Sequence, residues 1–122
     1  MMTNLQLTQE ISQLHADICS ALADPKRILI IYALAERPRS VNDLAEELDI
    51  SQPATSRNLK VLRDRGLVYT VRQGTTSEYH LTDIRLVEAL NMLREVLRDR
   101  LTYNASLMET TAEADQVAHA VS

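Results

Sequence analysis

The chain has 122 residues, a formal net charge of −4, one cysteine and neither phenylalanine nor tryptophan. Apolar residues make up 45% of it, which suffices for one small domain with a core of aliphatic side chains. No apolar run approaches the roughly 20 residues that cross a bilayer, and the N-terminus lacks the basic and apolar segments of a signal peptide. We therefore expect a cytoplasmic protein with no membrane partner, in which the lone Cys19 excludes an internal disulfide.

The first predicted helix covers residues 8–22. Apolar residues recur along it at steps of three and four, which places them on one stripe. The stripe consists of Leu7, Ile11, Leu14, Ile18 and Leu22. It either closes the core of a single chain or pairs with a second copy.

The second predicted helix covers residues 26–36. Asp24 followed by Pro25 predicts its start, because an acid is a good N-cap and proline fits the first helical position. The segment "KRILIIYALAE" is apolar nearly all round. Such a helix belongs in the middle of a domain.

Two short helices follow, joined by a tight turn. Ser40 predicts the start of a helix over 41–48, with Asp43 standing in for the glutamate of a capping box. Only two residues then precede Ser51, the predicted N-cap of a fourth helix. Gly66 predicts the end of that helix, because glycine readily adopts the left-handed conformation found there.

A change of pattern after Gly66 predicts a β-hairpin. Residues 67–73 and 77–81 alternate β-branched and aromatic residues around a Gly74-Thr75-Thr76 tip. Asp83 then predicts a last helix over 83–101, with Leu86, Leu90, Leu93, Leu97 and Leu101 on one stripe.

These elements predict one winged helix-turn-helix domain over 1–110, mainly α with a small hairpin in the order α-α-α-α-β-β-α. Residues 111–122 have little to bury, and we expect them to fray. The stripes on the first and last helices offer more apolar surface than one small body should expose, which predicts a dimer. Its predicted interface consists of Ile11, Leu14, Ile18, Leu86, Leu90, Leu93 and Leu97.

Charge is unevenly distributed along the chain. Residues 51–80 carry a net charge of +3, and the remainder carries −7. A basic region on an acidic body is compatible with local contact to phosphate, since only the docking face must be positive. An ordinary solvated helix face would look the same.

The fourth helix leaves a polar side free when Leu59 and Leu62 face the core. In a helix-turn-helix the second helix lies in the DNA major groove with its N-terminal residues against the bases. Gln52 can pair with adenine and Arg57 with guanine, whereas residues further along the helix are expected to meet phosphate. The predicted DNA-binding set is Gln52, Pro53, Thr55, Ser56, Arg57, Lys60, Arg63 and, on the hairpin, Arg72.

The stretches "ALADPKRILIIYAL", "VNDLAEELDISQPATSRNLKVLRDRGLV" and "VRQGTTSEYHL" together resemble the ArsR/SmtB family of bacterial winged-helix repressors. The resemblance covers roughly residues 21–101. It implies a homodimer built on the first and last helices that reads an inverted repeat in an operator. It also implies that an inducer, commonly a metal ion, releases the DNA.

The sequence departs from the metal sites of that family. Where arsenic- and cadmium-sensing members have "CVCDL", this chain has "SVNDL", with Ser40 and Asn42 in place of thiolates. The zinc-type site of the last helix would fall on Asp83, Arg85, Val96 and Asp99. An arginine does not ligate zinc, so we expect neither site.

His15 and Cys19 are the remaining sensor candidates, one helical turn apart. The alternative is a small buried cysteine beside an exposed histidine. The inducer would be a metal ion or a thiol-reactive compound, or there would be none. No motif suggests an enzyme. The rival function is a winged helix that binds protein and has no operator, which would not need Gln52, Ser56 and Arg57 free.

Overall fold

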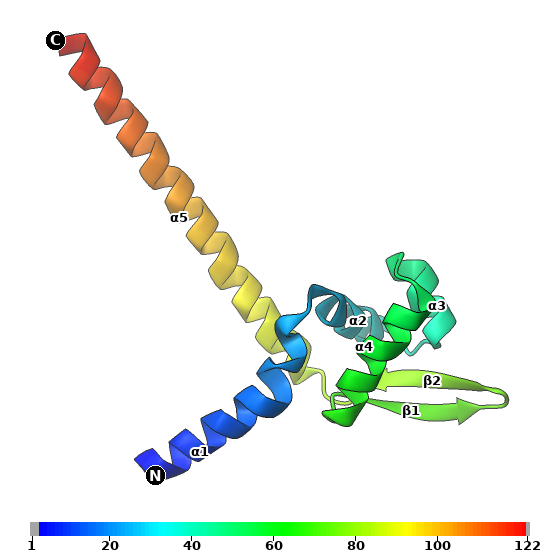
Figure 1. Cartoon of the computed structure of the whole chain (residues 1–122). Helices are drawn as coiled ribbons and strands as arrows, with labels where there is room; N and C mark the ends of the chain where they lie inside the picture. The colour runs from blue at the N-terminus through cyan, green and yellow to red at the C-terminus, as the bar shows by residue number, and fades with distance from the viewer. Residues whose placement is uncertain (1–2, 122) are drawn as a thin grey trace. The chain divides into compact units, whose positions relative to one another are not determined.

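The structure is a computed structural model that describes the backbone of residues 3–121 and the side chains of residues 3–109. It has two compact units, Met1–Ile84 and Arg85–Ser122 (Figure 1). The first contains α1 (Asn4–Leu14), α2 (Pro25–Glu36), α3 (Val41–Leu48), α4 (Gln52–Asp64), β1 (Val68–Gln73) and β2 (Thr76–Leu81). The order of these elements matches the prediction.

The first helix differs from its predicted range of 8–22 at both ends. It begins four residues earlier, because Thr3 and Gln6 form a reciprocal capping box. It also ends at Leu14 and passes into a π-helical turn, η1 (His15–Cys19), and then a 3-10 turn, η2 (Ala21–Ala23). In η1 the Ser20 N–H bonds to the carbonyl five residues earlier, at 3.0 Å.

The predicted caps of the next three helices are confirmed. The side chain of Asp24 accepts the N–H of Lys26, and Ser40 and Ser51 likewise cap α3 and α4. Gly66, after α4, has a φ of +75°. Asp49, in the turn between α3 and α4, also has a positive φ of 54°, a conformation that aspartate tolerates better than most residues.

The core of the first unit lies where α2, α3 and α4 meet. The largest fully buried apolar side chains are Ile30 and Ile31 of α2, Leu44 of α3, and Leu59 and Leu62 of α4. The central place predicted for α2 and the inward stripe predicted for α4 are therefore confirmed. Burial of this aliphatic surface is the main stabilising term for the unit.

The hairpin pairs antiparallel from Val68 opposite Leu81 to Gln73 opposite Thr76. Its second strand is also paired with the segment before α3. The Tyr79 N–H donates to the Arg39 carbonyl at 2.8 Å, and the Arg39 N–H donates to the Tyr79 carbonyl at 3.2 Å. This bridge fixes the base of the hairpin to the helices.

The side chain of Arg39 is buried, and the residue is only 3% exposed. Its guanidinium donates to the carbonyl of Ala33 at the end of α2. It also lies 3.1 Å from the carboxylate of Glu36 and 2.9 Å from that of Glu47 in α3. One residue therefore joins α2, α3 and, through its backbone, β2.

We expect Arg39→Met to lower the free energy of unfolding by about 1–2 kcal/mol, because methionine fills the space but can neither donate to the Ala33 carbonyl and the Glu36 carboxylate nor pair with the charge of Glu47. Urea unfolding followed by circular dichroism measures the change. Arg37→Met, an exposed site two residues earlier, is the matched control and should shift stability by less than about 0.5 kcal/mol. Equal midpoints for the two variants would contradict this account of Arg39.

The second unit is one helix, α5 (Arg85–Val121), which begins two residues after the predicted cap Asp83. Its exposed large apolar residues are Met92, Leu93, Val96, Leu97, Leu101, Tyr103, Leu107 and Met108. The expected fraying of residues 111–122 concerns a stretch outside the described side chains, and it stays a prediction. Within the described residues, no helix combines the length and apolarity needed to span a membrane.

Candidate nucleic-acid interface

The start of α4 presents a polar surface to solvent. The Ser51 hydroxyl accepts the Ala54 N–H at 3.3 Å, and Pro53 occupies the first turn, where a missing N–H costs no helical hydrogen bond. Gln52, Ser56 and Arg57 are all exposed. They form a surface at the N-terminal end of a helix that follows a tight turn, as base recognition requires.

The buried side of α4 corrects one member of the predicted set. Thr55 is 0% exposed, and its hydroxyl donates to the Ser51 carbonyl at 2.9 Å. It therefore belongs to the core and not to the surface that could meet DNA. The reason is periodicity: Thr55 lies four residues before Leu59 and seven before Leu62, on the face that packs inward.

The C-terminal half of α4 carries the cations predicted to meet phosphate. Lys60 and Arg63 are exposed, as a phosphate contact requires. The Lys60 ammonium lies 2.9 Å from the carboxylate of Asp64, one turn further along. Lys60 thus has a carboxylate partner within the helix.

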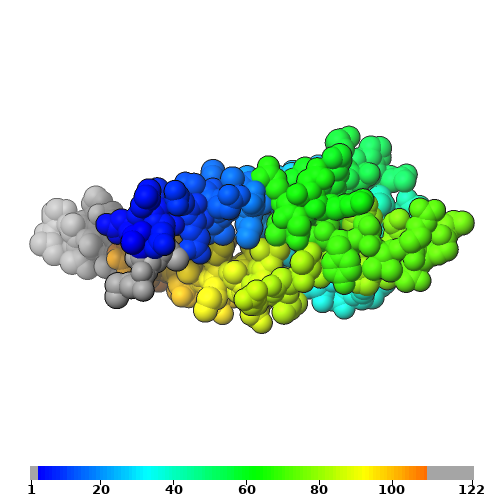
Figure 2. All heavy atoms as spheres, turned by 90° about the horizontal axis from the view of Figure 1, so that it is seen from below, coloured from blue at the N-terminus to red at the C-terminus, as the bar shows by residue number. Residues whose placement is uncertain are grey.

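The hairpin adds a further exposed cation. Arg72 is exposed, and its Nε donates to the Gly74 carbonyl at the hairpin tip, 3.2 Å away. Figure 2 shows the surfaces of α4 and the hairpin adjoining on one face of the first unit. On the strands, the rings of Tyr69 and His80 stack across the pair with centroids 5.0 Å apart, which supports the hairpin.

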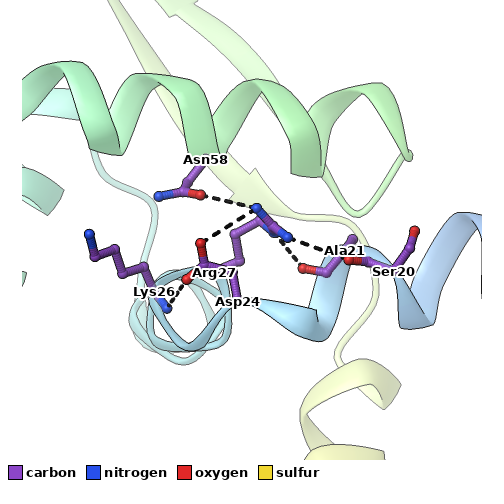
Figure 3. A network of polar contacts seen from close by, with 6 residues as sticks. All are labelled: Ser20, Ala21, Asp24, Lys26, Arg27 and Asn58. Atoms are coloured by element: carbon purple, nitrogen blue, oxygen red, sulfur yellow. Dashed lines mark hydrogen bonds and ion pairs between the residues drawn. The ribbon is translucent and has the colours of Figure 1, made fainter.

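Arg27 and Asn58 form a polar network behind this surface that the sequence did not predict (Figure 3). Arg27 donates through Nη1 to the Asn58 Oδ1 of α4 at 3.2 Å, and through Nε to the Ala21 carbonyl at 2.6 Å. Its Nη2 donates to the Ser20 carbonyl at 3.4 Å, and Asp24 lies 3.7 Å from its Nη1. The available signal was the D-P-x-R motif, in which Arg27 follows the cap of α2 by three residues.

The residues that replace the family's metal ligands have other surroundings. The Ser40 hydroxyl accepts the Asp43 N–H at 3.2 Å as the cap of α3, and Asn42 is exposed. Among the residues whose side chains are described, no three of the types His, Cys, Asp and Glu are grouped so as to hold a metal ion.

His15 and Cys19 begin and end the π-helical turn, and both are exposed. The alternative of a small buried cysteine is not met in the single chain, where the thiol is exposed. The two residues are four positions apart in the sequence. Whether they bind a ligand together stays a prediction.

Comparison with known proteins agrees with this geometry. The model of the bacterial regulatory proteins of the arsR family matches residues 24–70. The transcriptional regulator NmtR of Mycobacterium tuberculosis is 40% identical over 83 residues, which are 66% of this chain and 69% of that protein. A transcriptional repressor SmtB homolog of Synechocystis is 39% identical over 85 residues, 70% of this chain and 62% of that protein.

Solved structures share the fold. A homodimeric winged helix-turn-helix DNA-binding domain, Mb0332 of Mycobacterium bovis, superposes with a TM-score of 0.68 and 25% identity, over 82% of this chain and 91% of that one. The helices, the turn and the hairpin of the first unit are thus those of a winged helix-turn-helix. The chain belongs to the arsR family of bacterial regulatory proteins and is a DNA-binding transcriptional regulator.

Proposed function

We propose that the chain acts in the cytoplasm as a homodimeric repressor that reads an inverted-repeat operator and releases it when an inducer binds. The observation that carries this proposal is the exposed N-terminal surface of α4, formed by Gln52, Ser56 and Arg57. Side chains of these types can read base edges in the major groove. Lys60, Arg63 and Arg72 would contact the phosphates of the DNA backbone.

Exposed apolar residues on two helices support the dimer. On α1 these are Leu7, Ile11 and Leu14, and on α5 Leu93, Leu97 and Leu101 are exposed. An exposed apolar surface of this extent usually marks a site of interaction with another molecule. Of the other predicted interface residues, Ile18 and Leu86 are half-buried and Leu90 is buried, so the exposed members would contribute most.

A two-fold dimer would explain how one short helix achieves specificity. Two copies of α4 placed about 34–36 Å apart would enter successive major grooves on one side of the duplex. Each would then read one half of an inverted repeat. A lone copy reads only one half-site and binds correspondingly less tightly.

The inducer would act at a site other than the two metal sites from which the sequence departs. The exposed pair His15 and Cys19 is the candidate sensor. An imidazole and a thiolate one turn apart suit a soft metal ion, and an exposed thiol suits a thiol-reactive compound.

The test is binding of the protein to the DNA upstream of its own coding sequence, compared with a random duplex of equal length. We expect preference for the upstream DNA, and no preference would refute the operator. Adding Zn(II), Cd(II), Ni(II), As(III) or a thiol oxidant in turn then identifies the inducer. If one compound releases the DNA and the Cys19→Ser variant no longer responds to it, the sensor includes Cys19. If none of these compounds releases the DNA, the inducer is neither one of these metal ions nor a thiol oxidant.

A further inference from the structure

Two arginines tie the recognition helix α4 to the turns that follow α1. Arg27 links Asn58 of α4 to the carbonyls of Ser20 and Ala21 (Figure 3). Arg65, which caps the end of α4, donates to the Ala16 carbonyl and lies 3.6 Å from the carboxylate of Asp17. One tie lies near the middle of α4 and the other at its end, so both the rotation and the tilt of the helix are constrained.

The first tie is withdrawn from solvent and adjoins the predicted base contact. Asn58 is 9% exposed, and the side chain of Arg27 is 16% exposed, so neither is placed to meet DNA. Arg57 precedes Asn58 by one residue, a step of about 100° around the helix. A rotation of α4 that moves Asn58 from Arg27 therefore moves Arg57 by the same angle.

Burial of Leu59 and Leu62 decides which side of α4 faces the core, and hydrogen bonds, which require a narrow range of angles, can narrow the orientation further. The polar ties are directional. A buried amide oxygen or guanidinium that loses its partner is costly, so rotated positions of α4 are disfavoured. The carbonyls that hold the arginines come from the segment of η1 and η2, where the regular helical pattern of bonding is interrupted.

We propose that Arg27 and Arg65 are positioning residues for DNA recognition, which fix the orientation of α4 relative to α1 without contacting base edges. The inference rests on the proposed function, in which α1 pairs with a second copy and α4 reads a half-site. The distance and angle between the two recognition helices of the dimer then depend on these ties.

The test compares Arg27→Met with Lys26→Met, an exposed neighbour that loses the same charge. For Arg27→Met we expect a roughly 3- to 30-fold loss of affinity for the upstream DNA, unchanged affinity for a random duplex, and an unchanged slope of log affinity against log salt. Lys26→Met should match the wild type in its ratio of specific to random binding. Light scattering and circular dichroism establish that each variant is assembled and folded.

Changes at Asn58 provide the rescue. Asn58→Asp keeps an acceptor for Arg27 and should retain the specificity ratio, whereas Asn58→Leu should lose it to the same extent as Arg27→Met. The double variant, R27M combined with N58L, should be no worse than either single variant, because the two residues form one contact. Additive losses would overturn the proposed tie.

Arg65→Met keeps the proposal testable if Arg27→Met does not fold, since Arg65 lies at a more exposed position, with 38% of its side chain accessible. Specificity should fall while the salt slope is retained. A slope reduced by about 0.9, with specific and random DNA weakened alike, would make Arg65 a phosphate contact and overturn its positioning role. If the wild type prefers the upstream DNA and the variants show the same ratio of specific to random binding, the positioning role is refuted and the proposed function stands. If the wild type itself shows no preference for the upstream DNA, the proposed function is refuted as well.

Discussion

Replacing Leu93 by arginine will convert the proposed dimer into monomers and lower affinity for the upstream DNA by about 10²- to 10⁴-fold. Leu93 is 62% exposed on the apolar stripe of α5, where a partner would cover it. The substitution places a charge in each half of the interface, and an uncompensated buried charge costs about 3–5 kcal/mol. The loss of DNA affinity follows because each monomer engages one half-site without the gain from a linked second site.

Light scattering and DNA binding measured at the same protein concentration check this expectation. Glu95→Arg is the matched control, because Glu95 is also exposed on α5 but lies two residues away, on the opposite side of the helix. It adds more positive charge than the Leu93 variant and should leave the assembly intact. A dimeric L93R protein would show that the stripe around Leu93 is not the seam.

Replacing Arg57 by alanine will weaken binding to the upstream DNA by about 1–3 kcal/mol and relax the base preference at one position of each half-site. The physical reason is that a bidentate contact from arginine to guanine discriminates among bases by that amount. Binding to random duplexes should change far less. Titration of the upstream duplex and of variants substituted at each position locates the base that Arg57 reads.

Lys60→Ala is the comparison for the Arg57 experiment, because Lys60 lies one turn further along the same exposed side of α4. It should weaken specific and random DNA alike and reduce the salt slope by about 0.9. If Arg57→Ala behaved in this way too, Arg57 would contact phosphate, and the assignment of base reading to it would be wrong.

Most of the fold could be predicted because its signals are local. Caps at Asp24, Ser40 and Ser51 and a glycine after α4 are chemical requirements of helix ends, and alternation predicted the hairpin. The exposed side of α4 followed from the inward stripe. Thr55 is a member of the predicted DNA-binding set, and a hydroxyl can contact DNA. Its position on the helix nevertheless places it in the core.

The polar contacts between distant segments could not be predicted. Arg39 reaches Glu47 and Arg27 reaches Asn58 only after α2, α3 and α4 have packed. The D-P-x-R motif marks Arg27 but does not indicate Asn58 as its partner, and nothing local distinguishes Arg39 from the exposed Arg37. The π-helical turn could not be predicted either. The residues of this turn fit the pattern of a regular helix, and nothing in their sequence indicates that the Cys19 side chain is exposed.

Lys60 and Asp64 form an ion pair with their charged groups 2.9 Å apart. The carboxylate of Asp64 therefore competes with DNA phosphates for the ammonium of Lys60. Before Lys60 can engage a phosphate it must exchange a carboxylate that is already in place, so part of the attraction to any duplex is cancelled in advance. The proposed base contacts of Gln52 and Arg57 would not be subject to this exchange. The carboxylate of Asp64 would therefore reduce what Lys60 contributes to binding on every sequence, and the preference for the operator would depend on the base contacts.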